Sequence, residues 1–186
     1  MAEHRVCPWW LGYLLACPLR RLAQDPARIL TPYVRNGMTV LESGPGMGFF
    51  TLELARMVGT AGRVVAVDVQ PKMLSRLRRR LAKAGLLERV DVRLAGADSM
   101  GLADLTGTID FVLAFAMVHE LTAPDRFFAE AAQVLKPGGG LLLAEPIGHV
   151  RAPQFEQQLA LAAQVGLRLI ERPSIRRSHA ALLKRD

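Results

Sequence analysis

The sequence predicts an α/β fold with a doubly wound parallel sheet. Short apolar runs of strand length alternate with longer segments of helical period along most of the chain. A glycine-rich loop joins the first of these strands to a helix, as in nucleotide-binding and cofactor-binding α/β folds. The last two strand-like runs are separated by too few residues for a helix, so we expect them to pair antiparallel. A length of 186 residues fits one domain, with residues 1–36 as an N-terminal helical segment that precedes the core at 37–186.

The individual elements follow from periodicity and punctuation. Buried parallel strands are expected at 38–41, 63–69, 90–94, 109–115 and 141–144. Two helices carry apolar stripes, at Phe50, Leu54, Met57 and Val58 and at Leu74, Leu77, Leu81 and Ala84. Pro71 and Pro124 suit first helical turns, Gly85 and Gly166 suit helix ends, and 153–165 predicts a further helix. The C-terminal pair of strands is expected at 167–175 and 178–184.

Composition excludes several classes of protein. Hydrophobic residues make up 51% of the chain, which excludes general disorder. The formal charge of +7 permits an anionic partner without choosing one. Cys7 and Cys17 form no disulfide framework and no CxxC metal pair. The apolar run at 6–19 is interrupted by prolines, is too short to span a bilayer and is a poor signal peptide, so we expect a cytoplasmic protein.

The strongest functional signal is the glycine loop. A strand ends at Glu42, and Gly44, Gly46 and Gly48 follow at alternate positions before a helix expected near Phe49. Glycines let a ligand approach bare backbone, and the helix start offers unpaired N–H donors. The G-x-G-x-G spacing differs from both the dinucleotide fingerprint and the P-loop. An acid at the strand end repels a pyrophosphate and attracts a cationic amino group or a sulfonium.

A second acid ends the next strand. Asp68 lies twenty residues after Gly48, where a carboxylate can accept hydrogen bonds from both hydroxyls of a ribose. The alternative is that Asp68 caps the helix that begins near Pro71. Its pairing with Glu42 favours the ligand-binding interpretation.

On these motifs the sequence resembles the class I S-adenosylmethionine-dependent methyltransferases, in particular the small type 11 and ubiquinone/menaquinone-biosynthesis-like enzymes. The resemblance covers about 38–184, with its motifs at 41–48, 97–99, 115–120 and 135–140, the last being the turn before the fifth strand. It implies a Rossmann-like sheet in the order 3-2-1-4-5-7-6 with strand 7 antiparallel. It also implies S-adenosyl-L-methionine as cofactor, held by Glu42, Gly44, Pro45, Gly46, Gly48, Phe49, Asp68, Val69, Met73, Ala97, Asp98 and Phe115.

Two further pairs of residues follow the fourth and fifth strands, at the edge where open α/β sheets bind ligands. His119 and Glu120 are the catalytic candidates, for substrate contact or proton handling. Glu145 and His149 are candidates for substrate binding. A hydrogen-bonded substrate pocket is favoured here, and a metal site made of His119, Glu145 and His149 is the minor alternative.

The resemblance implies that the N-terminal segment covers the active site as a lid, so Trp9, Trp10 and Tyr13 are candidates to wall an apolar or cationic substrate. The alternative is a fixed structural cap. No large insertion follows the fifth strand, which favours a small-molecule acceptor. The basic residues gather on one helix and near the C-terminus, which suits solvated surfaces and an edge strand protected by charge, or else a peripheral contact with an anionic membrane.

We therefore expect an enzyme that transfers a methyl group from S-adenosyl-L-methionine to a small-molecule acceptor. One form of this hypothesis has an apolar acceptor. Two alternatives stay open: a catalytically silent cofactor-binding scaffold, and a methyltransferase of a membrane-presented lipid or quinone. Nucleic acid is not expected as a substrate, because the chain lacks the Asn/Asp-Pro-Pro-Tyr/Phe tetrapeptide and the catalytic Pro-Cys of nucleic-acid methyltransferases. The sequence does not choose an oligomeric state.

Overall fold

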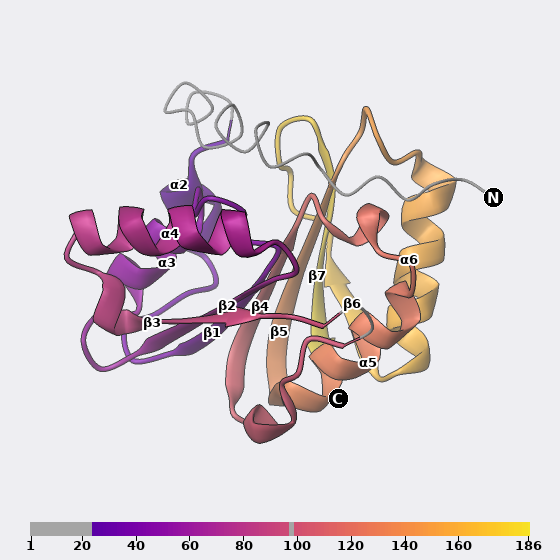
Figure 1. The fold of residues 1–186 in the computed structure, drawn as a ribbon. Coiled ribbons are helices and arrows are strands. Elements are labelled where there is room, and N and C mark those ends of the chain that lie inside the picture. Colours follow the sequence, from indigo (N-terminus) through magenta and orange to yellow (C-terminus); the bar gives the residue numbers. More distant parts are fainter. Residues whose placement is uncertain (1–23, 97–98) are drawn as a thin grey trace.

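The computed structural model describes residues 24–96 and 99–186. These residues form seven strands: β1 (Thr39–Ser43), β2 (Arg63–Asp68), β3 (Val90–Leu94), β4 (Ile109–Phe115), β5 (Leu135–Pro146), β6 (Leu167–Glu171) and β7 (Ser178–Arg185). The strands make one sheet in the order β3-β2-β1-β4-β5-β7-β6 (Figure 1). The first five run parallel, and β7 is antiparallel to β5 and β6. The predicted fold class and strand order are confirmed.

The fifth strand differs from its predicted bounds. It begins at Leu135, so residues 135–140, expected as a turn, belong to the strand. Ile109 of β4 lies opposite Leu135, and Phe111 lies opposite Gly140. The intervening residues of β5 form a bulge, in which Gly138 has a φ of +75°. A bulge keeps the chain paired where periodicity alone indicates a break.

The helices are α2 (Pro26–Leu30), α3 (Thr51–Met57), α4 (Pro71–Lys83), α5 (Pro124–Val134) and α6 (Ala152–Gln164). Prolines in the first turn begin α4, α5 and α6, as predicted for the first two. Gly85 and Gly166 have positive φ angles just past α4 and α6, which confirms them as helix ends. The helix after the glycine loop begins at Thr51 rather than near Phe49, because a turn occupies the residues between Gly46 and Phe50.

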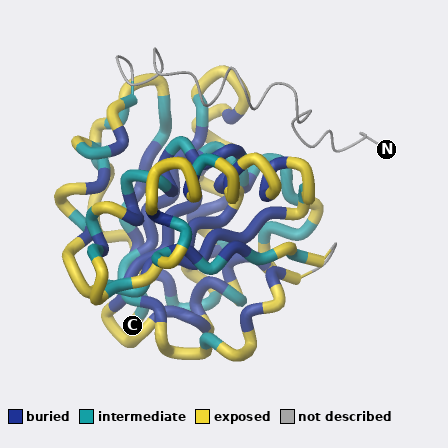
Figure 2. The backbone as a smooth tube through the Cα atoms, turned by 60° about the vertical axis from the view of Figure 1, so that its left-hand side comes forward, coloured by how far each residue is buried: buried dark blue, intermediate teal, exposed yellow. Residues whose placement is uncertain are grey.

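Helices cover both faces of the sheet (Figure 1). Along β4, Phe111 and Leu113 pack in the cluster that includes α2, α3 and α4, while Val112 and Ala114 pack in the cluster that includes α5 and α6. Figure 2 shows the strands buried beneath helices whose outer faces are exposed. Ligand access is consequently left to the edge where the strands end. No helix within the described ranges has both the length and the apolar character to cross a membrane.

Candidate active site

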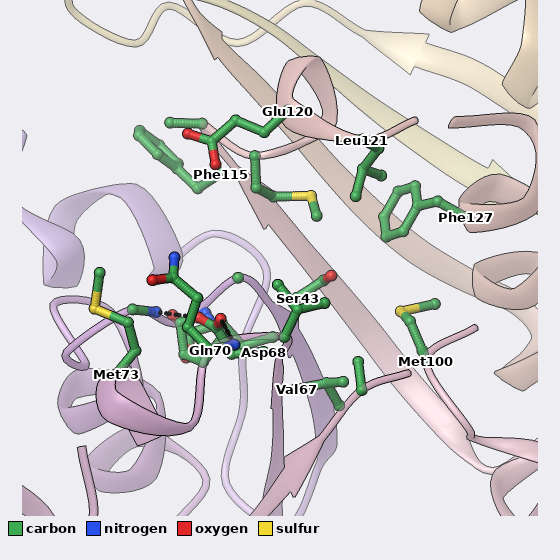
Figure 3. A pocket seen from close by; sticks show the side chains of 18 of the residues that line it. Ser43, Val67, Asp68, Gln70, Met73, Met100, Phe115, Glu120, Leu121 and Phe127 are labelled. Atoms are coloured by element: carbon green, nitrogen blue, oxygen red, sulfur yellow. Dashed lines mark hydrogen bonds between the residues drawn. The ribbon is translucent and has the colours of Figure 1, made fainter. Parts of the chain in front are cut away.

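A cavity of about 230 Å³ lies at the carboxyl ends of the parallel strands. Its wall includes the ends of β1, β2 and β4, the loop after β3 and the start of α5. In Figure 3, Asp68 and Gln70 lie on one side of this space, with Glu120 and Phe115 opposite. Met100, Leu121 and Phe127 extend the wall with apolar side chains. Parallel α/β sheets bind ligands at this edge because their loops and helix starts converge there.

The three glycines of the loop serve different purposes. Gly44, Gly46 and Gly48 have φ angles of +70°, +54° and +84°, which glycine adopts without strain. A Cβ on Gly44 would lie 2.9 Å from the Cβ of Met117, and one on Gly48 would lie 2.5 Å from Cδ1 of Leu77. A Cβ on Gly46 would meet no atom within 4 Å. Gly44 and Gly48 thus permit close packing, whereas Gly46 leaves bare backbone on the cavity wall.

Asp68 links the end of β2 to the glycine loop. Its Oδ1 accepts a hydrogen bond from the backbone N–H of Gln70 at 2.9 Å, and its Oδ2 accepts one from Gly46 at 3.1 Å. Burial raises the pKa of Asp68 above its usual value, although both N–H groups favour the charged form. Each carboxylate oxygen has a further lone pair for a ligand. Asp68 therefore combines the two roles considered from sequence, since it organises the turn before α4 and also lines the cavity.

Glu42 is a buried acid in the cavity wall at the end of β1. Its residue is 3% exposed, and its Oε2 has no hydrogen-bond partner. Burial raises the pKa of Glu42 to about 8; the side chain of Thr51 acts against this shift, and the negative charge of Asp68 adds to it. A buried, unpaired carboxyl oxygen is costly unless a ligand supplies a donor or a positive charge.

His119 and Glu145 form a pair next to the cavity. The short helix η5 (Val118–Glu120) follows β4, and Nδ1 of His119 contacts Oε2 of Glu145 at the end of β5. The other oxygen, Oε1, accepts a hydrogen bond from the backbone N–H of Val118 at 2.8 Å. Burial lowers the pKa of His119, but the hydrogen bond and charge of Glu145, with the charge of Glu120, outweigh it and raise the pKa overall.

Comparison with known proteins identifies the family. Residues 40–139 match the family model described as a methyltransferase domain. The chain belongs to this methyltransferase family. Its fold and motifs are those of the class I S-adenosylmethionine-dependent enzymes, which confirms the resemblance and the cofactor inferred from sequence.

Individual relatives agree with this assignment. The ubiquinone/menaquinone biosynthesis C-methyltransferase UbiE of Enterobacter sp. (strain 638) is 35% identical over 112 residues, which cover 60% of this chain and 44% of that protein. UbiE of Escherichia coli O1:K1 is 34% identical over 112 residues, with the same coverage of both chains. The methyltransferase chain thus spans less than half the length of these relatives. The crystal structure of a SAM-dependent methyltransferase from Aquifex aeolicus has a TM-score of 0.86 and 27% identity, and the match covers 96% of this chain and 99% of that one.

The residues of the cavity fit S-adenosylmethionine. Glu42 offers an unpaired carboxyl oxygen for a cationic group, and Asp68 offers spare lone pairs for ribose hydroxyls. Gly46 leaves open space where a side chain would otherwise project. These three features lie around one cavity at the ends of the neighbouring strands β1 and β2.

The structure brings most of the proposed cofactor residues of the methyltransferase to the cavity wall. The lining candidates are Glu42, Gly44, Pro45, Gly46, Phe49, Asp68, Val69, Met73, Phe115 and Glu120. Gly48, His119, Glu145 and His149 do not line it. Glu145, a candidate for substrate contact, is fully buried and holds His119 instead. Trp9, Trp10 and Tyr13, with Ala97 and Asp98, lie outside the described residues.

The minor metal-site alternative is not supported by the geometry. The rings of His119 and His149 lie 5.4 Å apart between centroids, and Glu145 contacts only the first of them in a hydrogen bond. Within 24–96 and 99–186, no three His, Cys, Asp or Glu side chains are grouped so that they could hold a metal ion.

Sequence reasoning missed the contribution of α5. Arg126 and Phe127 in the first turn of this helix line the cavity, and so does Glu130 further along it. Oε2 of Glu130 accepts a hydrogen bond from the backbone N–H of Met100 at 2.9 Å, which fixes the loop after β3 against α5. The available signal was the proximity of Pro124 to the His119-Glu120 pair, because a helix that begins there must start at the same sheet edge.

Proposed function

We propose that the protein transfers a methyl group from S-adenosylmethionine to a small, apolar acceptor bound at this cavity. The observation that carries the proposal is the unpaired, buried Oε2 of Glu42 in the cavity that Asp68 also lines. Two acids at adjacent strand ends suit a cofactor with a cationic part and a ribose. A phosphate-bearing cofactor would place its negative charge against both.

The cofactor supplies the reactive methyl group on a sulfonium. The protein therefore has to bind the cofactor and the acceptor, orient them and handle a proton. Asp68 holds the ribose hydroxyls, and the backbone at Gly46 permits close approach. A positive charge beside Glu42 favours its ionised form, so Glu42 would lose its proton and neutralise the cationic amino group when the cofactor binds. Glu120 lines the same cavity, and its Oε1 lies 4.0 Å from Nε2 of the proposed base His119. This proximity supports a role for both side chains in receiving a proton from the acceptor.

Apolar side chains elsewhere in the wall support an apolar acceptor. Met100, Met117, Leu121 and Phe127 line the cavity, and the UbiE relatives carry the name of ubiquinone/menaquinone biosynthesis C-methyltransferases. Apolar and aromatic surfaces of this kind suit a flat aromatic ring. Hydroquinones with short prenyl chains are therefore the first acceptors to test.

A second candidate function is methylation of an acceptor that a membrane presents. The positive charge of α4 favours this candidate. Lys72, Arg76, Arg79 and Lys83 are exposed along one stripe of this helix, which has no acidic residue. The helix begins at the cavity, which Gln70 and Met73 line. We expect the protein to sediment with vesicles that contain both phosphatidylglycerol and phosphatidylcholine, and to sediment little with vesicles of phosphatidylcholine alone. The double variant Arg79→Glu/Lys83→Glu should lose the binding, and equal sedimentation with both vesicles contradicts this candidate.

Calorimetry with S-adenosylmethionine and its demethylated product tests the main proposal. We expect both to bind, and a panel of hydroquinone, phenol, thiol and amine acceptors should reveal transfer of radiolabelled methyl. The proposal would be overturned if neither compound bound to the protein. Binding without transfer to any acceptor in the panel would favour the silent scaffold.

A further inference from the structure

Glu145 is a buried carboxylate at the end of β5 that no step described so far requires. It is fully buried, and both of its oxygens are engaged: Oε2 contacts Nδ1 of His119, and Oε1 accepts the Val118 N–H at 2.8 Å. A buried carboxylate is expensive unless its partners compensate for the lost water. Both compensating contacts come from η5, the segment that also carries Glu120 to the cavity.

The contact at Nδ1 determines what the other ring nitrogen can do. An ionised carboxylate only accepts hydrogen bonds, so Nδ1 must carry the hydrogen and the neutral ring keeps its lone pair on Nε2. Nε2 of His119 lies 4.0 Å from Oε1 of Glu120. That separation exceeds a hydrogen bond, but a small rotation of Glu120 or one bridging water closes it.

We infer that Glu145 is a positioning residue for proton transfer in this site: it holds His119 with Nε2 available, so that His119 can take a proton from Glu120 at the cavity wall. The inference rests on the proposed function for its catalytic meaning. An acceptor with an ionisable hydrogen releases one proton as it gains the methyl group, because the sulfonium leaves as a neutral thioether with its bonding electrons. That proton passes to the Glu120 carboxylate and then to Nε2 of His119.

The surrounding charges favour this arrangement. Glu145 on β5 and Glu120 on η5 both stabilise a protonated His119. Across the cavity, the charge of Asp68 interacts with that of Glu120. His149 in the turn after β5 lies near the ring of His119, and His179 on β7 lies opposite Glu145 in the sheet register. The carboxylates outweigh burial, so His119 is a stronger base than a free imidazole.

Glu145→Gln tests the inference with little change of shape. The Gln Oε1 still accepts the Val118 N–H, but its amide NH₂ now faces Nδ1 and donates to it. The neutral ring must then carry its hydrogen on Nε2, where it cannot accept a proton. We expect the pKa of His119 to fall by about 1 to 3 pH units, because the neighbouring negative charge is lost.

The measurement is an imidazole ¹H–¹⁵N and ¹H–¹³C NMR titration of the full chain, with His119→Asn to identify the signal. In the native protein, the neutral His119 ring should carry its hydrogen on Nδ1. The control Glu156→Gln removes a carboxylate that pairs with Arg172 on the surface, and it should change neither the tautomer nor the pKa of His119. An Nε2–H tautomer in the native protein overturns the inference, even if Glu145→Gln fails to fold. So does a pKa of His119 that is the same in Glu145→Gln as in the native protein.

Kinetics with any acceptor that the panel finds provide a second readout. Glu145→Gln should lower kcat about 100-fold or more, leave KM for S-adenosylmethionine unchanged and move the acid limb of the pH profile to lower pH. An unchanged kcat contradicts the positioning role while leaving the proposed methyl transfer intact. A protein that fails to bind S-adenosylmethionine contradicts the proposed function, whereas the NMR titration decides the geometry of His119 independently.

Discussion

The backbone N–H of Gly46 donates a hydrogen bond to Oδ2 of Asp68 at 3.1 Å, which ties the glycine loop after β1 to the end of β2. The same carboxylate holds the N–H of Gln70 at the start of α4. One side chain thus fixes the relative position of two segments on the cavity wall before any ligand arrives. Such preorganisation reduces the cost of ordering a binding site.

Asp68→Ala should weaken the binding of S-adenosylmethionine about 10- to 100-fold. The variant removes charge-assisted hydrogen bonds to the ligand and releases the loop at Gly46. Isothermal titration calorimetry measures the change in Kd. The matched control is Asp104→Ala, which removes an exposed acid paired with Arg93 outside the cavity wall. Equal Kd values for the two variants would exclude a binding role for Asp68.

Gly46→Ala and Gly85→Ala separate backbone strain from ligand exclusion. Both glycines have positive φ angles, and an added Cβ meets no atom within 4 Å at either one. Each alanine should therefore lower the free energy of unfolding by about 1–2 kcal/mol. Only Gly46 lines the cavity, so only Gly46→Ala should also weaken cofactor binding. Thermal unfolding and calorimetry measure the two effects, and equal Kd values would show that the ligand does not approach Gly46.

Glu42 should make the free protein less stable as the pH rises. Its pKa is about 8 in the folded protein against 4.5 for the unperturbed group, so the folded state holds a proton that the unfolded state releases between these values. The contribution of Glu42 is complete below about pH 4.5 and is lost as the pH rises to about 8. The free energy of unfolding should fall by about 1.4 kcal/mol per pH unit in this window.

Glu42→Gln should remove this slope, because the amide does not titrate. Urea unfolding at several pH values compares it with Glu88→Gln, which changes an exposed carboxyl on the helix η3 (Leu87–Arg89). A native slope that survives in Glu42→Gln would mean that Glu42 is ionised in the folded protein at neutral pH.

Leu113→Ala should cost about 2–5 kcal/mol of stability, because Leu113 is fully buried in the central strand β4. Leu169→Ala, on the edge strand β6, removes the same atoms from a residue that is 39% exposed, and should cost much less. Chemical denaturation compares the two variants. Equal losses would contradict the assignment of the core to the centre of the sheet.

The order and type of most elements could be predicted because they depend on local patterns. Strands at 90–94 and 109–115 coincide with β3 and β4, since short segments rich in β-branched and apolar residues are typical of strands. The bulge in β5 escaped prediction because it depends on pairing with Ile109 and Phe111, which the sequence around Leu135 does not reveal. Contacts between distant strands override the local turn signal of its glycines.

The sequence by itself determined the glycine loop and the acids Glu42 and Asp68, because backbone freedom and charge at strand ends are readable from residue types and spacing. Only the tertiary structure decided which role each of the other polar residues has. His119 and Glu145 are 26 residues apart and meet because β4 and β5 are parallel neighbours that end at the same edge. Burial then separates the roles of the two glutamates. Glu120 lines the cavity, while Glu145 is fully buried and can act only through the side chain of His119, which it holds.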